Sequence, residues 1–529
     1  MRKHFTCLSF FVYCLSCLHA QDSLKETNSR VKPVTNASFV TLISTISQKA
    51  NEQAITEKAP TLAHYDECFT AFAHEHGITC TQARELVNAW AQADSVKNEE
   101  GDLMLQGARN YYLKQFHTSS LYYEQAAILQ EESLPVNLTG AGGQDPAITA
   151  ATDATCTAYL LAGNSASEGG NFKRAIRLYR KADSLLLQDT PAQKKSHVQD
   201  LLAIVLYEEG NRLGGDEGFA LLTQAAALEQ AALARYSPTT FPQEWARSQS
   251  NLGTILQTQG ELVAGSTGDS LFLQSLSAYN AALTVYTKKD QPQDWARMQN
   301  NMGVVLSNLG AIEEAIAAFR AALEIYTRQD HPQDWALAQY NLGNMLQFWG
   351  SDTKDAAAII LFKESAAAYR LALEVYTEKE SPEEWAWAQH HLGVSLFEQG
   401  RVTEGRTLLS EAVAAFRAAL IVHTKECFPE AYASTQYNLG TALWEESSRA
   451  ATNSIILLEE AVMAYTAALD FYTQKDNPEQ WFNTQNSLGL LQEQKQQWTA
   501  AIRHFENLRD MEPMYAAQKV NELRRKAGQ

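Results

Sequence analysis

Apolar residues recur along this chain with the period of an amphipathic helix. In "AAFRAALEIYT" (residues 317–327), apolar side chains are spaced at i, i+3, i+4 and i+7, which places them on one helix face. Segments of this kind alternate with a second kind that begins at a proline, such as "HPQDWALAQYNLGNML" (residues 331–346). Nowhere do polar and apolar residues alternate with a period of two over several segments, as strands require. The pattern predicts an all-α protein assembled from pairs of helices.

The proline-initiated helices repeat six times with one skeleton. An aromatic residue follows the Pro by three positions, and a Gln and a Gly follow the aromatic by four and by eight. Pro suits the first helical position because the N–H that it lacks would be unpaired there. A Gly inside a helix costs stability, so its recurrence predicts a close approach of a neighbouring helix. The aromatics are Trp245, Trp295, Trp335, Trp385, Tyr432 and Trp481, and the glycines are Gly253, Gly303, Gly343, Gly393, Gly440 and Gly489.

Successive aromatics are separated by 40 to 50 residues, a period typical of stacked helical units. The spacing resembles the tetratricopeptide repeat, in which a Gly in the first helix is followed 16 residues later by an aromatic in the second, with Ala three residues beyond. Gly303, Phe319 and Ala322 follow this rule, and the same spacing occurs upstream between Gly163 and Tyr179. The resemblance implies an α-solenoid, a right-handed superhelix of about nine helix pairs over roughly residues 98–513.

Four units depart from that spacing. The distance from Gly to aromatic is 26 residues for Gly253 and Gly343, 23 for Gly393 and 25 for Gly440. The extra residues fall at the turn between the two helices and are apolar enough to lengthen both. Because each repeat turns the same way, the lengthened ends should line one edge of the superhelix as a ridge.

Smaller signals refine the helix boundaries. Ser381 and Asn477, each followed three residues on by Glu or Gln, predict capping boxes. Gly350 is expected to end the first helix of its unit as a C-terminal cap. The recurring Gln, Gln485 among them, is expected to bond between repeats.

The N-terminus has the features of a secretory signal. Arg2 and Lys3 precede an apolar stretch that ends at a possible cleavage site after Ala20. This predicts a periplasmic or extracellular protein, with lipidation at Cys17 as the alternative, and no later segment is apolar enough to predict a membrane span. The expected divisions are residues 1–20 signal peptide, 21–37 flexible tether, 38–97 N-terminal helical cap, 98–190 repeats with a Gly/Pro-rich loop at 134–152, 191–513 a continuous array and 514–529 a C-terminal capping helix.

The formal net charge is −18. Such a surface repels phosphate backbones, so we expect no nucleic-acid partner. The chain contains no G-x-S-x-G, no H-E-x-x-H and no phosphate-binding glycine loop. We therefore expect no catalytic residues and no cofactor.

Polar side chains beside the repeat glycines are candidate binding residues. Asn lies two residues before the Gly in four units, and Arg lies six residues before it in two. In tetratricopeptide domains that bind peptides, these positions face the concave groove, where Asn bonds the ligand's backbone and the basic residue an acidic group. The alternative is that the Asn side chains bond the adjacent repeat. These residues are Asn251, Asn301, Asn341, Asn438, Arg247 and Arg297.

A separate cluster stands in "HYDECFTAFAHEHGITC" (residues 64–80). His64 and Cys68 are four residues apart, as are His76 and Cys80, so each pair shares a helix face. Imidazole and thiolate are usual zinc ligands. A zinc site, a Cys68–Cys80 disulfide and an ordinary helix pair all remain open.

We interpret the chain as a non-catalytic scaffold or adaptor that binds a peptide or a folded protein on the superhelix, in its concave groove or along the ridge. Two alternatives remain. One is a regulatory or sensor subunit with a ligand or metal site at residues 38–95, and the other is an enzyme of unrecognised type.

Overall fold

The computed structural model describes residues 103–112, 114–134, 146–186, 190–403, 405–450 and 454–528, with isolated positions at 41–42, 72–73 and 83. The predicted signal peptide, the predicted tether, most of the predicted cap and the cluster of His64, Cys68, His76 and Cys80 lie outside this part of the chain. The described residues form helices and no strand. The prediction of an all-α fold is confirmed.

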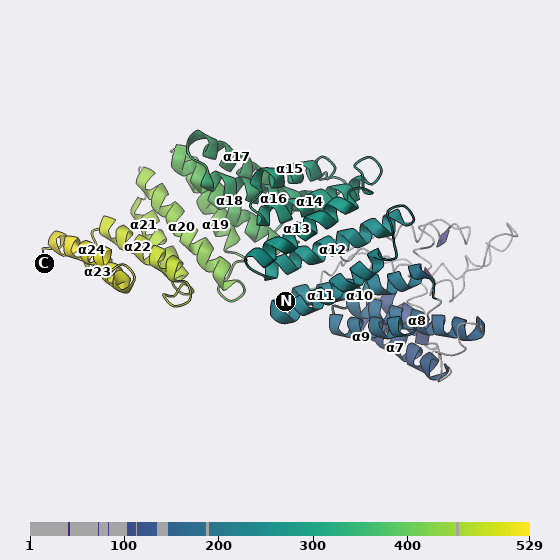
Figure 1. Ribbon diagram of the computed structural model, residues 1–529. Coiled ribbons are helices and arrows are strands. Elements are labelled where there is room, and N and C mark those ends of the chain that lie inside the picture. Colours follow the sequence, from purple (N-terminus) through teal and green to yellow (C-terminus); the bar gives the residue numbers. More distant parts are fainter. Residues whose placement is uncertain are drawn as a thin grey trace, which may run out of the picture. The chain divides into compact units, whose positions relative to one another are not determined.

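Consecutive helices pack against each other in pairs, as Figure 1 shows. Within the described residues there are nine such pairs, which confirms the predicted tetratricopeptide-type solenoid; the first helix of a pair is called helix A and the second helix B. The pairs are α6 (Leu103–Tyr112) with α7 (Phe116–Glu132), α8 (Pro146–Glu168) with α9 (Phe172–Ser184), α10 (Ala192–Leu213) with α11 (Gly215–Leu233), α12 (Pro242–Leu262) with α13 (Ser266–Ala282), α14 (Pro292–Asn308) with α15 (Ile312–Leu323), α16 (Pro332–Asp352) with α17 (Asp355–Ala372), α18 (Pro382–Thr403) with α19 (Arg406–Ala419), α20 (Pro429–Arg449) with α21 (Ser454–Ala468), and α22 (Pro478–Gln494) with α23 (Trp498–Asn507).

A short 3₁₀ turn, η4 (Leu508–Asp510), and a last helix, α24 (Pro513–Lys526), follow the ninth pair. Helix α24 packs on α23 and buries Ala516, Val520 and Leu523. The chain divides into two compact units, Met1–Val285 and Tyr286–Gln529. Helices α6 to α13 therefore belong to the first unit, and α14 to α24 to the second.

The prolines stand where they were expected, at the first positions of helices such as α12, α14 and α16. The capping box predicted at Asn477 is wrong, because the side chain of Asn477 makes no capping bond. The Ser381 hydroxyl accepts a hydrogen bond from the Thr377 N–H at 3.1 Å, and the capping box at Ser381 stays a prediction.

The turn before several of these prolines is ordered by a threonine. Thr327 Oγ1 donates to Asp330 Oδ2 at 2.8 Å and accepts from the Asp330 N–H at 3.1 Å. Thr473 and Asp476 make the same two bonds at 2.8 and 3.0 Å. The Thr-x-x-Asp pattern thus fixes the entry into the next helix A.

The repeat glycines lie directly against aromatic rings of helix B. A Cβ atom added to Gly253 would stand 2.6 Å from the ring of Tyr279, and one added to Gly393 would stand 2.7 Å from Phe416. Gly303, Gly343, Gly440 and Gly489 face Phe319, Tyr369, Tyr465 and Phe505 in the same way. The conserved spacing of Gly and aromatic within the chain therefore has a steric cause: only Gly lets the two helices approach over the ring.

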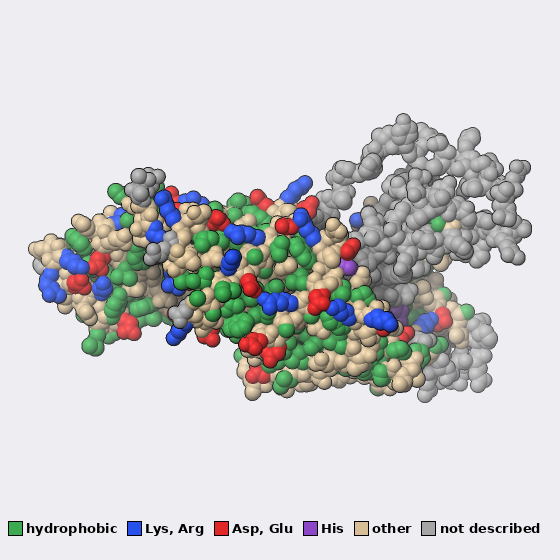
Figure 2. Space-filling model, turned by 90° about the horizontal axis from the view of Figure 1, so that it is seen from above, with side chains coloured by type: hydrophobic (Ala, Val, Ile, Leu, Met, Phe, Trp, Pro, Cys, Tyr) green, Lys and Arg blue, Asp and Glu red, His purple; other side chains and the backbone are tan. Residues whose placement is uncertain are grey.

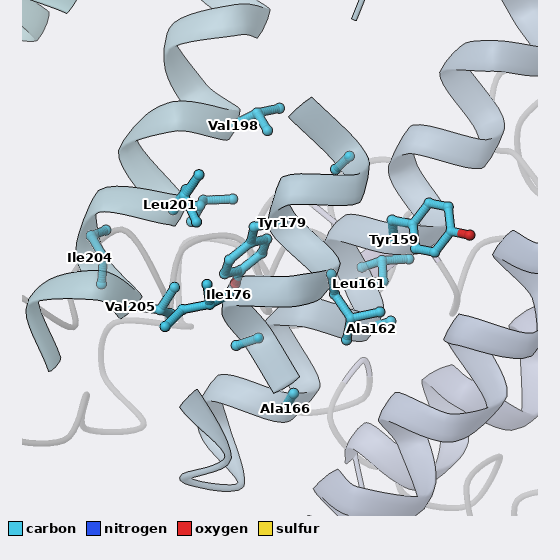
Figure 3. Packing of buried hydrophobic residues seen from close by; sticks show 14 of the residues in the cluster. Tyr159, Leu161, Ala162, Ala166, Ile176, Tyr179, Val198, Leu201, Ile204 and Val205 are labelled. Carbon is cyan, nitrogen blue, oxygen red and sulfur yellow. The ribbon is translucent and has the colours of Figure 1, made fainter. Parts of the chain in front are cut away.

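The core is continuous across the pairs α8/α9 and α10/α11. Figure 3 shows Ile176 and Tyr179 of α9 beside Val198, Leu201 and Val205 of α10, with residues of α8 on the other side. Tyr179 has no exposed surface, and burying one such side chain stabilises the fold by roughly 1.5–3 kcal/mol. Each pair thus depends on its neighbours to cover its apolar faces.

The additional residues lengthen both helices of a pair. Helices α12 and α13 have 21 and 17 residues, whereas α14 and α15 of the unextended pair have 17 and 12. Gly350 does not end its helix, because α16 continues to Asp352 and the backbone of Gly350 packs on the ring of Phe362. The loop expected at 134–152 also ends early, since α8 begins at Pro146. No helix among the described residues is long and apolar enough to cross a membrane.

Candidate functional site

The pair α10/α11 breaks the rule that Gly faces an aromatic. Ala203 stands where the other helices A have Gly, and Glu229 stands where the other helices B have Tyr or Phe. Glu229 is fully buried, and its Oε1 accepts a hydrogen bond from Asn251 Nδ2 at 2.9 Å. Its Oε2 has no hydrogen-bond partner among the described residues. A carboxyl group thus replaces a ring in the middle of the first unit's core.

A second buried carboxyl lies close to it. Asp200 of α10 is 6% exposed, and Arg247 of α12 donates to its Oδ2 at 2.7 Å. Burial raises the pKa of Glu229 to about 8, and the charge of Asp200 raises it further while the bond from Asn251 opposes the change. Burial also raises the pKa of Asp200, although Arg247 acts against this. Asp200, Glu229, Arg247 and Asn251, called the acidic cluster here, favour a protonated Glu229 near neutral pH.

The acidic cluster corrects the sequence prediction for Asn251. Asn251 is 4% exposed and donates to Glu229, so its amide does not face a groove. The alternative interpretation, bonding to the adjacent repeat, holds for Asn251, although the partner is a side chain and not the backbone. Arg247 pairs with Asp200 of the preceding helix A while its side chain is 36% exposed, and its role towards an acidic group of a partner stays a prediction. The signal available in the sequence was the Glu that replaces an aromatic in a strict register.

The remaining candidates do not form a uniform row. Arg297 pairs with Asp294 of its own helix at 2.6 Å. Asn341 Nδ2 donates to Asn300 Oδ1 at 3.3 Å, between neighbouring helices A, whereas Asn301 and Asn438 are half-buried. The recurring Gln also differs from expectation in its last copy. Gln485 Oε1 lies 2.7 Å from His504 Nδ1 and accepts from Asn507 Nδ2 at 3.3 Å, so these contacts stay within the pair α22/α23.

In the second unit, one helix A position changes from basic to apolar. The residue six before the repeat glycine, called the face position here, is Arg297 in α14 but Leu337 in α16 and Trp387 in α18. Leu337 is 41% exposed and Trp387 is 37% exposed. Helices α16 and α18 contact each other. Two large apolar side chains therefore reach the surface from the same position of successive helices A.

The indole of Trp387 packs against two histidine rings. It lies 4.6 Å, edge to face, from the ring of His423, and it stacks on His391 with centroids 6.0 Å apart. His391 in turn stacks on Tyr369, the ring that packs on Gly343. The position of Trp387 is thus linked through ring contacts to the core of the repeat.

Burial keeps these histidines neutral, and the neighbouring imidazoles add to the effect for His390 and His391. His390 Nδ1 lies 2.8 Å from Thr435 Oγ1, and His391 Nδ1 lies 3.0 Å from Gln347 Oε1. Burial lowers the pKa of His391 and of His423 to about 4 and lowers that of His390 as well. Although several imidazoles meet here, no group of three His, Cys, Asp or Glu in the described part of the chain is arranged to hold a metal ion. The arrangement suits apolar contact and not metal or acid–base chemistry.

The outer surface of the helices B in the second unit carries a series of ion pairs. An Arg that directly follows the core aromatic pairs with a Glu of the next helix B: Arg320 with Glu364 at 2.9 Å, Arg370 with Glu411, and Arg417 with Glu460. In the view of Figure 2, basic and acidic side chains likewise lie beside one another over much of the surface. These three pairs are called the ion-pair ladder.

Comparisons with known proteins give structures but no sequence relative. No family model and no curated protein matches the chain. YrrB, described as a TPR protein with an unusual peptide-binding site, is 18% identical with a TM-score of 0.30, over 46% of this chain and 97% of its own. The C-terminal part of a TPR repeat-containing protein from Cytophaga hutchinsonii is 15% identical with a TM-score of 0.35, over 60% and 97%. The human IFIT1 dimer with m7Gppp-AAAA is 12% identical with a TM-score of 0.38, over 93% and 96%. At these identities the likeness is one of fold.

Proposed function

We propose that this tetratricopeptide-type solenoid is a non-catalytic scaffold that binds a peptide segment of a partner protein on the helix A face of α16 and α18. The observation that carries the proposal is the exposure of Leu337 and Trp387 at the same face position of neighbouring helices. Large apolar side chains normally leave the surface on folding. Two in register on adjacent repeats form a surface that a partner's apolar residues would cover.

The environment of Trp387 supports its role as an anchor. Tryptophan is enriched among the residues that dominate binding energy at protein interfaces. The rings of His391 and His423 fix the indole before binding, so little side-chain entropy is lost when a partner arrives. Because these imidazoles are neutral at pH 7, the anchor lies on an uncharged support. The expected ligand presents aliphatic or aromatic side chains to Leu337 and Trp387.

We also propose that nucleic acid is not the partner. The formal net charge of −18 opposes a phosphate backbone. Phosphate-binding proteins place basic side chains along the ligand's path, whereas the face positions of α16 and α18 are Leu and Trp.

A capture experiment tests the proposal. The full chain is immobilised, incubated with an extract of the source cells, and the retained proteins are identified by mass spectrometry for the wild type and for Leu337→Ser/Trp387→Ala. We expect the double variant to lose the retained partner, since removing an interface hot spot costs about 2 kcal/mol or more. Met463→Ser is the matched control, because Met463 is 71% exposed on helix B α21. Equal retention by all three proteins contradicts the proposal.

The ridge of lengthened helix ends is the second candidate surface. It has exposed apolar residues where helices A end and helices B begin in the second unit: Phe348, Ile360, Val402, Ile455 and Ile456. Its C-terminal part is braced, because Arg449 of α20 donates to the carbonyl groups of Gly400 and Arg401 at the end of α18. Loss of the partner in Ile360→Ser/Ile455→Ser, with retention in the Leu337/Trp387 variant, would move the binding site to this ridge.

We also propose that the protein is exported. The support is the order of basic residues, apolar stretch and small residue in positions 1–20. Fractionation of the source cells and sequencing of the mature N-terminus provide the test. A mature chain starting at Gln21 is expected, and an intact Met1 in the cytoplasmic fraction would contradict export.

A further inference from the structure

Helix α9 presents an unusual row of basic side chains for so acidic a protein. Lys173, Arg177, Arg180 and Lys181 are exposed and line a shallow hollow of about 280 Å³ together with Ile176. With spacings of four, three and one residues, they follow one face of the helix. These four residues, with Arg174 beside them, are called the basic row.

The charges of the basic row are only partly neutralised. Glu124 of α7 accepts from both Arg174 and Arg177, and Glu131 of α7 pairs with Lys181 at 2.9 Å. Two carboxylates thus face five cations. The acid on α9 itself, Asp183, points to α10, where it accepts from Gln199 at 3.2 Å.

Two cations of the row have no carboxylate partner. Arg180 donates to Gln224 Oε1 of α11 at 2.7 Å, which is a neutral acceptor. Lys173 has no ion-pair or hydrogen-bond partner among the described residues. The basic row therefore keeps an excess of positive charge at the surface.

Comparison with the ion-pair ladder shows that Arg180 lacks the acidic partner found in the second unit. Arg180 directly follows the core aromatic Tyr179, as Arg320 follows Phe319 in the second unit. The ladder partner lies five residues before the core position of the next helix B. In α11 that residue is Gln224, five before Glu229, whereas it is Glu364 in α17. One uncharged residue thus leaves Arg180 available to an external anion.

We propose that the basic row of α9 binds a short acidic peptide segment of a partner protein. The charged part of the row, from Lys173 to Lys181, extends over roughly 12 Å at 1.5 Å per residue, which matches a few carboxylates and not a long polyanion. Ile176 lies in the floor of the hollow between the cations, so an apolar side chain flanked by acids fits there. The net negative charge of the whole chain would oppose the continuation of a nucleic acid beyond the row.

Fluorescence polarisation with a labelled peptide tests the proposal. The probe is the peptide Glu-Asp-Glu-Ile-Asp-Glu-amide, with fluorescein attached to its N-terminal amine. The comparison probes are its Gln/Asn analogue and a single-stranded hexanucleotide, labelled with the same dye. We expect the full chain to bind the acidic peptide alone, with affinity that falls as salt is added. Absence of binding, or stronger binding of the oligonucleotide, overturns the proposal.

The decisive variant is Gln224→Glu, which leaves every basic residue in place. The new carboxylate would pair with Arg180 as Glu364 pairs with Arg320, and we expect peptide affinity to fall about two- to fivefold, the value of one exposed ion pair. Lys173→Gln/Arg180→Gln should lower it further. Arg320→Gln, on an equivalent position of the second unit, should leave it unchanged. Circular dichroism and thermal melts establish that each variant is folded. Unchanged affinity in both Gln224→Glu and Lys173→Gln/Arg180→Gln, or an equal loss in Arg320→Gln, overturns the proposal.

Discussion

The pairs α10/α11 of the first unit and α18/α19 of the second solve the same packing problem in different ways. In α18/α19, Gly393 admits the ring of Phe416, whereas in α10/α11 the corresponding positions are Ala203 and the buried Glu229. The aromatic ring needs only packing contacts and no hydrogen-bond donor. The carboxyl requires a donor, which Asn251 of the following pair supplies. A repeat can therefore exchange an apolar core contact for a polar one where the neighbouring pair supplies a donor, and here the donor is the Asn that recurs at this position as Asn301, Asn341 and Asn438.

The difference extends to the charge states of the two units. The first unit buries carboxyl groups, whose pKa rises, and the second buries imidazoles, whose pKa falls. Burial is the leading cause in both, because a low dielectric disfavours the charged form of each group. Since a neutral carboxyl is protonated and a neutral imidazole is not, the two units should respond to pH in opposite directions.

The largest effect on stability is expected when a carboxyl group is placed at the core position of α19 in the second unit. Phe416→Glu would bury an acid and would lose the ring contact with Gly393. The donor available to the new carboxyl would be Asn438, which occupies in α20 the position that Asn251 occupies in α12. We expect a loss of about 3–5 kcal/mol or more in the free energy of unfolding. Urea unfolding of the full chain, followed by hydrogen exchange over α18 and α19, measures it. Phe416→Tyr is the control, because Tyr occupies this core position in five other described pairs. A loss no larger than that of the control would show that Asn438 satisfies the carboxyl as Asn251 does in the first unit.

The opposite pH responses form the second prediction. A carboxyl with its folded pKa near 8 keeps its proton in the folded state, so the first unit is most stable below pH 4.5 and loses stability as pH rises from there through 8. Histidines with folded pKa near 4 stay neutral, so the second unit is most stable above pH 6.5 and loses stability as pH falls through that value towards 4. Hydrogen exchange, corrected for intrinsic rates, should show α10–α12 opening more at pH 8.5 than at pH 6. Helices α18–α20 should open more at pH 5 than at pH 7. A common direction in both units would refute the comparison.

The smallest effect is expected from Glu229→Gln. The amide oxygen can still accept from Asn251, and the residue no longer ionises. The stability of the first unit should therefore fall less between pH 5 and 8.5 than it does in the wild type. Asp200 remains and keeps a weaker slope of the same sign. The measurement is the melting temperature against pH, with Glu217→Gln, an exposed change in the same helix, as control. A slope equal to that of the wild type would place the titration elsewhere.

The solenoid could be predicted from the sequence because its rules are local. Pro at a helix start and Gly over an aromatic act through residues at fixed spacing, and both recur often enough to be recognised. Asn251 shows the limit. Its position in the row suggested a groove, but its bond depends on Glu229, a residue from another helix that breaks the repeat. Gly350 shows the same limit, since the continuation of α16 depends on the packing of Phe362.

The candidate binding face was only partly accessible to sequence reasoning. The face position was identified, and the change from Arg297 to Leu337 and Trp387 was visible in the sequence. The exposure of the two apolar residues and the support of Trp387 by His423 were not, because His423 comes from the segment after α19. The residues of a site that is built from three helices and a turn have no fixed spacing along the chain.

The threonine turn that precedes several of the helices A has a consequence for how the chain can change in length. Thr327 and Asp330 lead into Pro332 with the same bonds by which Thr473 and Asp476 lead into Pro478. A genetic duplication or deletion with both breakpoints in such turns therefore joins two compatible ends. The array can grow or shrink in steps of 40 to 50 residues without a new junction, and binding faces can be reordered as whole modules.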